Sequence, residues 1–274
     1  MYLKKLLQII SNPIELFRFL LIQLNLLLYF FNLGEFEKLR NLLNILRKEK
    51  KNNRAVIVGN GPSLCLEDLE KIQNADFFAF NKIYLAFQDT SWRPDYYLCE
   101  DYLVLSQNFE EISRFASQNP KIVSLIASYR QLRKIKQPNV FYFNYVTPKN
   151  NKQFFSKNPS QKIFCGYSVT YSALQLAVFL GYEEILFIGM DFEFKTDKNF
   201  DREFLLGDGT QNHFITGYRK VGEKWNKPKL NQQEKAFKHA SEVLSRQYSH
   251  IRVYNITRGG KFNFFQRKNI ESFF

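Results

Sequence analysis

Cysteine is scarce in this sequence of 274 residues. The three cysteines, Cys65, Cys99 and Cys165, are far apart and odd in number, so neither a disulfide framework nor a metal-ligand spacing can be read from them. We therefore expect a protein of the reducing cytosol, with Cys165 as a small buried apolar side chain rather than a nucleophile. Histidine is equally rare, with three in the chain, which leaves few candidates for a catalytic imidazole.

Several common motifs are also missing. The glycine-rich stretch at residues 59–63 has neither the spacing of G-x-G-x-x-G nor the lysine of a Walker loop. No nucleic-acid-binding motif and no internal repeat can be found. No small-residue cleavage site follows Leu6–Ile10, so we expect no secretory signal.

Positive charge is abundant. The formal net charge is +13, with a sequence pI of about 9.5, while hydrophobic residues make up an ordinary 45%. Residues 1–54 contain ten Lys and Arg against four Glu, which is +6 in the most apolar part of the chain. Basic residues next to an apolar segment favour an anionic membrane surface over nucleic acid as the partner.

The N-terminal segment is predicted to be helical. Asn12 and Pro13 form a helix start, and the apolar run that follows ends at Gly34. Only 16 residues separate Arg18 from Glu35, about 24 Å of helix against a hydrocarbon core of about 30 Å. A helix over 14–33 that lies in the membrane interface, or one that packs on protein, fits better than a full span.

A second amphipathic helix is predicted over 35–51, followed by a polar, basic hinge. We therefore divide the chain into a helical, membrane-associating extension, 1–52, and a catalytic domain, 53–274. In that domain short apolar runs alternate with helical stretches, including 109–118, 168–180 and 231–248. This alternation predicts an α/β fold with a mostly parallel, Rossmann-like sheet and helices on both faces.

Polar clusters follow four of the predicted strands. They are Gly59-Asn60-Gly61-Pro62-Ser63, Asn81, Glu100-Asp101 and Gly189-Met190-Asp191. Ligands of open parallel sheets bind at the carboxyl ends of the strands, where helix N-termini offer free N–H groups. The clusters therefore predict one ligand site at this edge of the sheet.

Four sequence elements in order carry a family resemblance: VIVGNGPSL, then FAFN, then GYSVTYSALQLAVFLGYEEILFIGMDF, and finally QNHF. Over roughly residues 54–274 the chain resembles the bacterial sialyltransferases that build lipooligosaccharides. It also resembles the related pterin-pyrophosphokinase-like and motility-accessory group. The resemblance implies a GT-A-like, Rossmann-like domain that binds a CMP-sugar without a required cofactor or metal.

The resemblance also implies roles for individual residues. His213 would be the general base that takes the proton of the acceptor hydroxyl. The nucleotide and its phosphate would be held by residues from the four clusters and the start of the long helix. These are Gly59, Asn60, Gly61, Pro62, Ser63, Asn81, Asp101, Ser168, Thr170, Gly189 and Asp191.

This sequence departs from the sialyltransferase pattern in two places. Glu193 occupies the position of a tyrosine that meets the leaving phosphate, and Asp101 replaces an asparagine. A carboxylate repels phosphate unless a cation lies between them, so a metal held by Asp191, Glu193 and Asp197 is conceivable. Alternatively, Glu193 faces solvent or pairs with a lysine. Extra positive charge could come from Arg202, Arg219, Lys220 and Lys224.

We expect a glycosyltransferase that moves a sugar, with sialic acid or another nonulosonic acid as a candidate, from a nucleotide sugar to a cell-surface glycan. A CMP-sugar is favoured, in lipopolysaccharide or capsule biosynthesis on the inner face of the cytoplasmic membrane. Two alternatives remain open: a pyrophosphokinase-like enzyme that uses ATP and Mg²⁺, and a membrane-associated scaffold without activity. Partners would be the two substrates and the membrane surface, not nucleic acid; an oligomer stays open.

Overall fold

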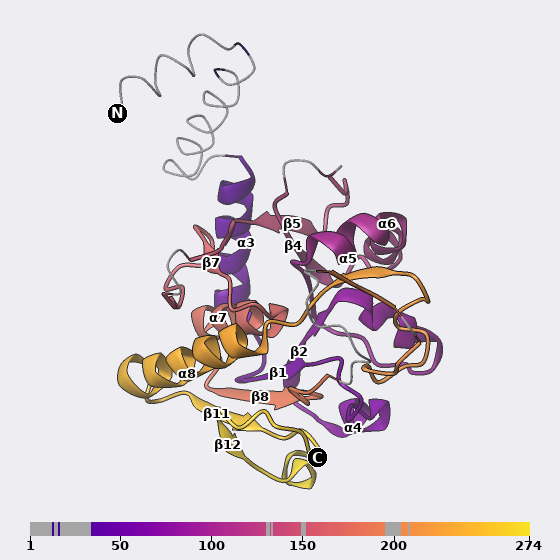
Figure 1. The fold of residues 1–274 in the computed structure, drawn as a ribbon. Helices are drawn as coiled ribbons and strands as arrows, with labels where there is room; N and C mark the ends of the chain where they lie inside the picture. The colour runs from indigo at the N-terminus through magenta and orange to yellow at the C-terminus, as the bar shows by residue number, and fades with distance from the viewer. Residues whose placement is uncertain are drawn as a thin grey trace, which may run out of the picture.

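The computed structural model describes residues 13, 16, 34–129, 132, 134–148, 152–194, 204–207 and 209–274. In this part of the chain eight strands form one sheet in the order β12-β11-β8-β1-β2-β3-β4-β5, and every pair in it is parallel (Figure 1). The strands are β1 (Arg54–Val58), β2 (Ala75–Phe80), β3 (Tyr96–Cys99), β4 (Val123–Ala127), β5 (Val140–Phe143), β8 (Glu184–Ile188), β11 (Arg252–Asn255) and β12 (Gln266–Arg267).

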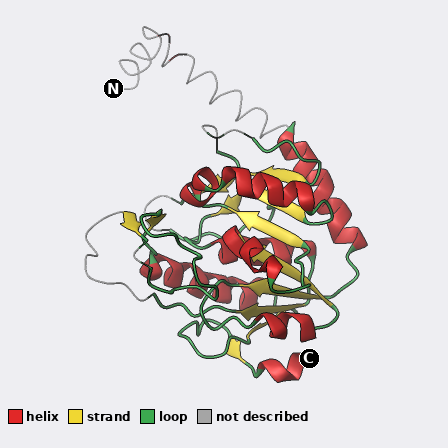
Figure 2. Ribbon diagram, turned by 90° about the vertical axis from the view of Figure 1, so that its right-hand side faces the viewer, coloured by secondary structure: helices red, strands yellow, loops and turns green. Residues whose placement is uncertain are grey.

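Helices cover both faces of this sheet (Figure 2). The apolar side chains of α3, α7 and α8 join one buried cluster, and those of α4, η1, α5, α6 and η2 join the other. The predicted α/β class with a parallel sheet is therefore confirmed. The helices on the first face are α3 (Glu35–Glu49), α7 (Val169–Leu180) and α8 (Leu230–Gln247). Those on the second are α4 (Leu66–Lys71), η1 (Asn81–Gln88), α5 (Tyr102–Gln107), α6 (Phe109–Gln118) and η2 (Ile270–Phe273).

Strand β1 explains why the sequence folds this way. Ala55 and Ile57 point into one cluster and Val56 and Val58 into the other, and all four are fully buried. A strand of a parallel sheet covered on both faces reads as a continuous apolar run, which is what residues 55–58 are.

The strand order reverses beside β1. From β1 the chain continues through β2 to β5 on one side, whereas β8, β11 and β12 are added on the other side. In open parallel sheets a ligand crevice forms where the order reverses, outside the carboxyl ends of the two strands. The turns after β1 and β8 lie at this point.

Helix α3 belongs to the core of the sheet domain, although the sequence analysis assigns residues 35–51 to the extension. Leu39 and Leu43 are fully buried with residues of the sheet and of α7. On the opposite side of α3, Ile45 is 50% exposed.

The predicted helix over 14–33 lies, apart from Leu16, outside the described residues, so its position stays a prediction. Among the helices that the structure describes, none is both long enough and apolar enough to cross a bilayer.

The C-terminal segment caps one edge of the sheet. Strand β12, which the sequence analysis does not identify, pairs with β11 and becomes the edge strand. The Arg267 guanidinium donates to the carbonyl oxygens of Thr257, Gly259 and Gly260 and fixes the turn between these strands. The described residues also form two small sheets: parallel β6 (Tyr145–Val146) with β7 (Ile163–Phe164), and antiparallel β9 (Phe204–Leu206) with β10 (Lys224–Asn226).

Candidate functional site

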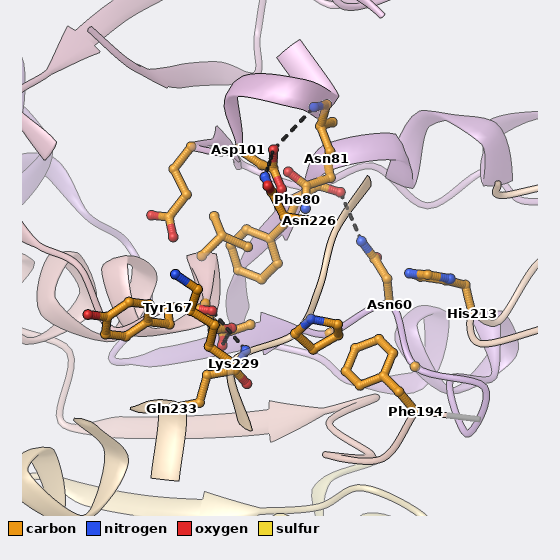
Figure 3. Close-up of a pocket in the computed structure, with 18 of the residues that line it drawn as sticks. Asn60, Phe80, Asn81, Asp101, Tyr167, Phe194, His213, Asn226, Lys229 and Gln233 are labelled. Carbon is orange, nitrogen blue, oxygen red and sulfur yellow. Dashed lines mark hydrogen bonds between the residues drawn. The ribbon is translucent and has the colours of Figure 1, made fainter. Parts of the chain in front are cut away.

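The four strand-end clusters meet around one cavity of about 500 Å³ (Figure 3). All predicted site residues line it except two, Pro62 and Ser63. Residues that line the cavity include Gly59, Asn60, Gly61, Asn81, Asp101, Ser168, Thr170, Gly189, Asp191 and His213. The structure thus brings together residues that are up to about 150 positions apart in the sequence.

The turn after β1 is packed directly against the turn after β8. A Cβ atom on Gly61 would lie 1.8 Å from Asp191 Oδ2, and one on Gly59 would lie 2.4 Å from the Gly189 carbonyl oxygen. The Ser63 hydroxyl donates to Asp191 Oδ2 at 2.8 Å. The glycines therefore allow two loops to touch, and Ser63 acts through Asp191 rather than from the cavity wall.

Asn60 links three parts of the site. Its side-chain amide nitrogen donates to the Phe80 carbonyl oxygen (3.1 Å) and to the Tyr218 hydroxyl (2.9 Å). Its main-chain carbonyl oxygen accepts from Phe214 N. Its side-chain oxygen is buried without a hydrogen-bond partner among the described residues. An unsatisfied buried acceptor is costly, which makes this atom a candidate to bind a ligand N–H or O–H group.

Asn81 also has an unpartnered side-chain oxygen, and its backbone conformation is unusual. Its side-chain oxygen is also buried and unpartnered within the described chain. Its φ is 52°, in the left-handed region that few residues other than glycine adopt. Tyr167 (φ 59°) and Phe192 (φ 55°) share this backbone and line the same cavity. Such conformations cluster at functional sites because the surrounding structure must maintain them.

Asp101 has a structural task. Its Oδ1 atom accepts from Leu103 N (2.8 Å) and Val104 N (3.3 Å), which caps α5, and from the Asn226 amide (2.9 Å). Figure 3 shows Asn226 next to Asp101. The carboxylate is thus neutralised in part by helix N–H groups, which explains how an aspartate is tolerated near a prospective phosphate.

Ser168 and Thr170 lie at the N-terminus of α7. Ser168 is the residue before the helix, and its hydroxyl is bonded to that of Thr170 at 2.7 Å. The Ser168 side chain does not cap the helix, and Val169 also lines the cavity, so the N-terminus of α7 borders the cavity. Helix N-termini of this kind favour anions.

His213 stacks on Tyr218, with 3.9 Å between ring centroids and 5° between planes. Burial, and then the nearby Arg219 and Lys82, lower the pKa of His213 to about 3. The imidazole is therefore neutral near pH 7 and can accept a proton, although with this pKa it is a weak base.

Three basic residues of the described chain line the cavity: Arg219, Lys227 and Lys229. The Arg219 guanidinium lies over the Trp225 ring at 3.9 Å from its centroid, and its buried Nε has no hydrogen-bond partner in the described part of the chain. Lys229 lies over Tyr167 at 5.6 Å. Arg219 is among the residues that the sequence suggested as a source of positive charge at the site. Lys229 was not suggested, because it belongs to none of the motifs found in the sequence.

Two of the three carboxylates considered as metal ligands have other partners in the structure. Asp191 Oδ2 is bonded to Ser63, and Glu193 forms an exposed ion pair with Lys261 at 2.6 Å, as the lysine alternative predicts. Asp197, like Arg202, lies outside the described residues. In the part that the structure describes, no three His, Cys, Asp or Glu side chains are grouped as metal ligands. Of the three candidate ligands, the two that the structure describes, Asp191 and Glu193, are thus bonded to Ser63 and Lys261.

Sequence reasoning missed Tyr218 and named Glu100 only as part of a strand-end cluster, without a role. Glu100 is 7% exposed and lines the cavity, and Tyr218 is 5% exposed and contacts both Asn60 and His213. Glu100 belongs to a predicted strand-end cluster, so its position could have identified it. Tyr218 lies in a loop, and only its packing marks it.

Comparisons with solved structures found chains of low identity. The MAf glycosyltransferase from Magnetospirillum magneticum AMB-1 is 16% identical over 81% of this chain and 34% of its own, with a TM-score of 0.48. The sialyltransferase CstII from Campylobacter jejuni is 15% identical over 79% of this chain and 85% of its own (TM-score 0.42). The α-2,3-sialyltransferase Cst-I from the same organism is 17% identical over 76% of each chain (TM-score 0.37).

The comparison with models of protein families gives a clearer result. No curated protein matches the chain significantly. The family model of 6-hydroxymethylpterin diphosphokinase MptE-like proteins, however, matches residues 29–197, more than half of the chain, from before α3 to just beyond β8. This match includes the turns at Asn60, Asn81 and Asp191 and confirms the predicted resemblance to pterin-pyrophosphokinase-like proteins. The chain therefore belongs to the 6-hydroxymethylpterin diphosphokinase MptE-like family.

Proposed function

We propose that this protein is a glycosyltransferase that moves a sugar from a nucleotide sugar, with a CMP-sugar favoured, to a glycan of the cell surface. The observation that carries the proposal is the single cavity in which Asn60, Asn81, the start of α7, Arg219 and His213 come together. It provides recognition groups for a nucleoside, positive charge for a phosphate and a base for a hydroxyl.

The chemistry of each group suggests which part of the donor it holds. The unpartnered oxygens of Asn60 and Asn81 need hydrogen-bond donors, which a base or ribose offers and an ionised phosphate does not. The phosphate would instead lie near Arg219 and the N-terminus of α7. Together they would offset the charge that develops on the phosphate as it leaves.

These groups and the two substrates account for the proton and for each bond that forms or breaks in the transfer. His213 takes the proton of the acceptor hydroxyl, and the hydroxyl oxygen forms a bond to the anomeric carbon of the donor sugar. The bond between that carbon and the phosphate oxygen breaks, and its electron pair leaves with the nucleotide. A bound anionic phosphate would oppose the effect of Arg219 and Lys82 on His213, so the imidazole becomes a stronger base when the nucleotide is bound.

Replacing His213 tests this assignment. We expect His213→Ala to lower the rate of transfer by about 10²–10⁴-fold, the usual contribution of a general base, and to leave nucleotide affinity nearly unchanged. His250→Ala is the matched control, because His250 is exposed on a surface turn. Unchanged turnover in His213→Ala would remove His213 from the mechanism.

Family membership favours a second candidate, a diphosphokinase. In that reaction a substrate hydroxyl attacks the β-phosphorus of ATP, the bond to the α-phosphate oxygen breaks, and AMP leaves while the hydroxyl proton passes to a base. Mg²⁺ would arrive with ATP as part of the substrate.

A thermal-shift panel of CMP, UDP, GDP and ATP, each with and without Mg²⁺, separates the candidates. A ligand at one hundred times its Kd adds about 2.7 kcal/mol to the free energy of unfolding. Stabilisation by CMP without Mg²⁺ supports the glycosyltransferase, and stabilisation by ATP with Mg²⁺ alone supports the diphosphokinase. Stabilisation by none would favour the scaffold.

We also infer peripheral attachment to the inner face of the cytoplasmic membrane, from the basic and apolar residues 1–52. Co-flotation of the full chain with phosphatidylserine vesicles, reduced when Lys4, Lys5 and Arg18 are replaced by Gln, would support this inference. Equal flotation of both chains would contradict it.

A further inference from the structure

One end of the cavity is lined by tyrosines. We call it the tyrosine lobe, formed by Glu100, Tyr102, Tyr129, Tyr145, Cys165 and Tyr167. Its members are in contact: Tyr102 packs edge-on against Tyr129 (5.4 Å between centroids), and the Tyr145 hydroxyl is 2.7 Å from Cys165 Sγ. Figure 3 shows Tyr167 and His213 on opposite sides of the labelled residues. Tyr167 therefore lies away from the candidate base.

Glu100 is the only carboxyl group among the residues of this lobe. It is 7% exposed, and its Oε2 atom accepts a hydrogen bond from the fully buried Ser172 hydroxyl at 2.5 Å. The main-chain carbonyl oxygen of Glu100 accepts a hydrogen bond from the Tyr129 hydroxyl. The carboxyl group is thus held in place from β3 and α7 while the residue lines the cavity.

Among the described residues no cation forms an ion pair with this carboxyl or is among the groups that shift its pKa, although Lys227 and Lys229 line the same cavity and Lys229 lies over Tyr167. The titratable groups that act on it are Asp101 beside it and Tyr145 from β6, and it acts in turn on Tyr129 and Cys165, all of them neutral or acidic. Burial raises the pKa of Glu100 to about 7, against an ordinary 4.5. Buried acids without a counter-ion are rare in cores, and a strongly shifted carboxyl in a cleft is typical of a binding or catalytic group.

We propose that the tyrosine lobe binds a hydroxyl-bearing sugar ring and that Glu100 holds this ring as a neutral carboxylic acid. The inference rests on the proposed function and names a recognition residue for it. A carboxylic acid donates as well as accepts, so it can bond to the hydroxyl of a sugar while Ser172 keeps it oriented. The tyrosine rings offer apolar surface to the ring face and hydroxyl groups at its rim.

The protonation state follows from desolvation. A sugar in the lobe displaces water from a carboxyl group that forms no ion pair with the described residues, which disfavours its charged form further. Binding is therefore linked to proton uptake, and affinity for the sugar falls as the pH rises through the range in which Glu100 ionises. Asp101 reinforces this direction, because a second negative charge nearby also opposes ionisation.

The experiment measures the affinity of the full chain by calorimetry at pH 6.0 and pH 8.5. The probes are UDP against UDP-N-acetylglucosamine, CMP against CMP-N-acetylneuraminic acid, and lactose in the presence of CMP. The first two pairs report a sugar of the donor, and lactose reports a sugar of the acceptor. Glu100→Gln keeps the shape and a donor N–H group but cannot ionise, and Glu242→Gln on the exposed face of α8 is the control.

We expect wild type and Glu100→Gln to bind the sugar about equally at pH 6.0. At pH 8.5 wild type should bind it roughly tenfold or more weakly than Glu100→Gln. Comparing the two proteins at each pH cancels the titration of the nucleotide phosphate and of His213. A difference confined to lactose assigns the lobe to the acceptor, and one confined to the nucleotide sugars assigns it to the donor.

A second measurement does not depend on the variant. Titrations of wild type at pH 7.5 in phosphate and in Tris, which differ in ionisation enthalpy, should reveal proton uptake with the sugar that is absent with the nucleotide alone. Normal nucleotide binding with sugar binding that is independent of pH, or without proton uptake, overturns this inference alone. Failure of every nucleotide to bind overturns the proposed function and the inference with it.

Discussion

At the scale of single residues, Asn81 illustrates how the site is built. It directly follows β2, as the first residue of η1, with a φ of 52°, and the Tyr97 hydroxyl donates to its main-chain carbonyl oxygen at 2.8 Å. Asparagine tolerates this left-handed backbone better than other residues with a side chain. One residue therefore provides both the turn and the unpartnered amide oxygen.

Two substitutions separate these roles. Asn81→Gly should keep or slightly increase the free energy of unfolding, because glycine adopts positive φ freely, yet weaken nucleotide binding at least tenfold through loss of the amide. Asn81→Ala should weaken binding similarly and also destabilise the fold by about 1 kcal/mol. Urea unfolding and calorimetry check both. Full affinity in Asn81→Gly would show that the amide does not touch the ligand.

At the scale of elements, the loop that carries His213 is fastened to the start of η1. The Lys82 ammonium lies 2.5 Å from Glu223 Oε1 and donates to the Tyr218 carbonyl oxygen at 3.0 Å. The side chains of Lys82 and Glu223 are 4% and 10% exposed. Tyr218, stacked on His213, is positioned by this contact.

Removing the cation should loosen that loop. Lys82→Met leaves the buried Glu223 carboxylate without its partner, at a cost of about 3 kcal/mol in the free energy of unfolding. Turnover should fall because Tyr218 and His213 shift. The double variant Lys82→Met with Glu223→Leu should regain most of the stability, because an apolar pair can replace a buried ion pair. A single variant as stable as wild type in urea would contradict this role.

Helix α3 is the second element whose contribution can be measured. Leu43 is fully buried against the sheet domain, whereas Ile45 is 50% exposed. We expect Leu43→Ala to lower the free energy of unfolding by about 3 kcal/mol and Ile45→Ala to change it by less than about 0.5 kcal/mol. Equal effects in urea unfolding would mean that α3 does not share the core.

At the scale of the whole molecule, two buried groups make stability depend on pH in opposite directions. The pKa of Glu100 is raised to about 7, so the stability that its bound proton contributes is complete below pH 4.5 and is lost as the pH rises through 7. The pKa of His213 is lowered to about 3, so its contribution is present above pH 6.5 and is lost as the pH falls toward 3.

The Glu100 contribution can be isolated with Glu100→Gln. Its free energy of unfolding relative to wild type should rise by about 3 kcal/mol between pH 5 and pH 9, since one pKa unit corresponds to about 1.4 kcal/mol. The amide carries no charge to desolvate, whereas the wild-type carboxyl ionises in this range. Thermal or urea unfolding across this pH range measures it, and a difference that stays constant with pH would refute a titrating Glu100.

The sequence alone determined the fold class and the edge of the sheet at which the candidate site lies. Runs such as 55–58 are too apolar for anything but a strand covered on both faces, and helices 109–118, 168–180 and 231–248 agree with α6, α7 and α8 to within one residue at each end. Because the carboxyl ends of parallel strands share one edge, the polar residues that follow the strands had to meet there.

Only the tertiary structure decided what each of these residues contacts. Ser63 and Asp191 are 128 positions apart, and nothing local indicates that their side chains bond to each other rather than to a ligand. The burial and hydrogen bonds of Glu100 come from α7, β6 and the loops beside them, and the core position of α3 comes from its contact with α7 and the sheet. Burial and charge compensation depend on residues distant in the sequence, whereas periodicity and strand ends are local, and only local properties can be read from the sequence.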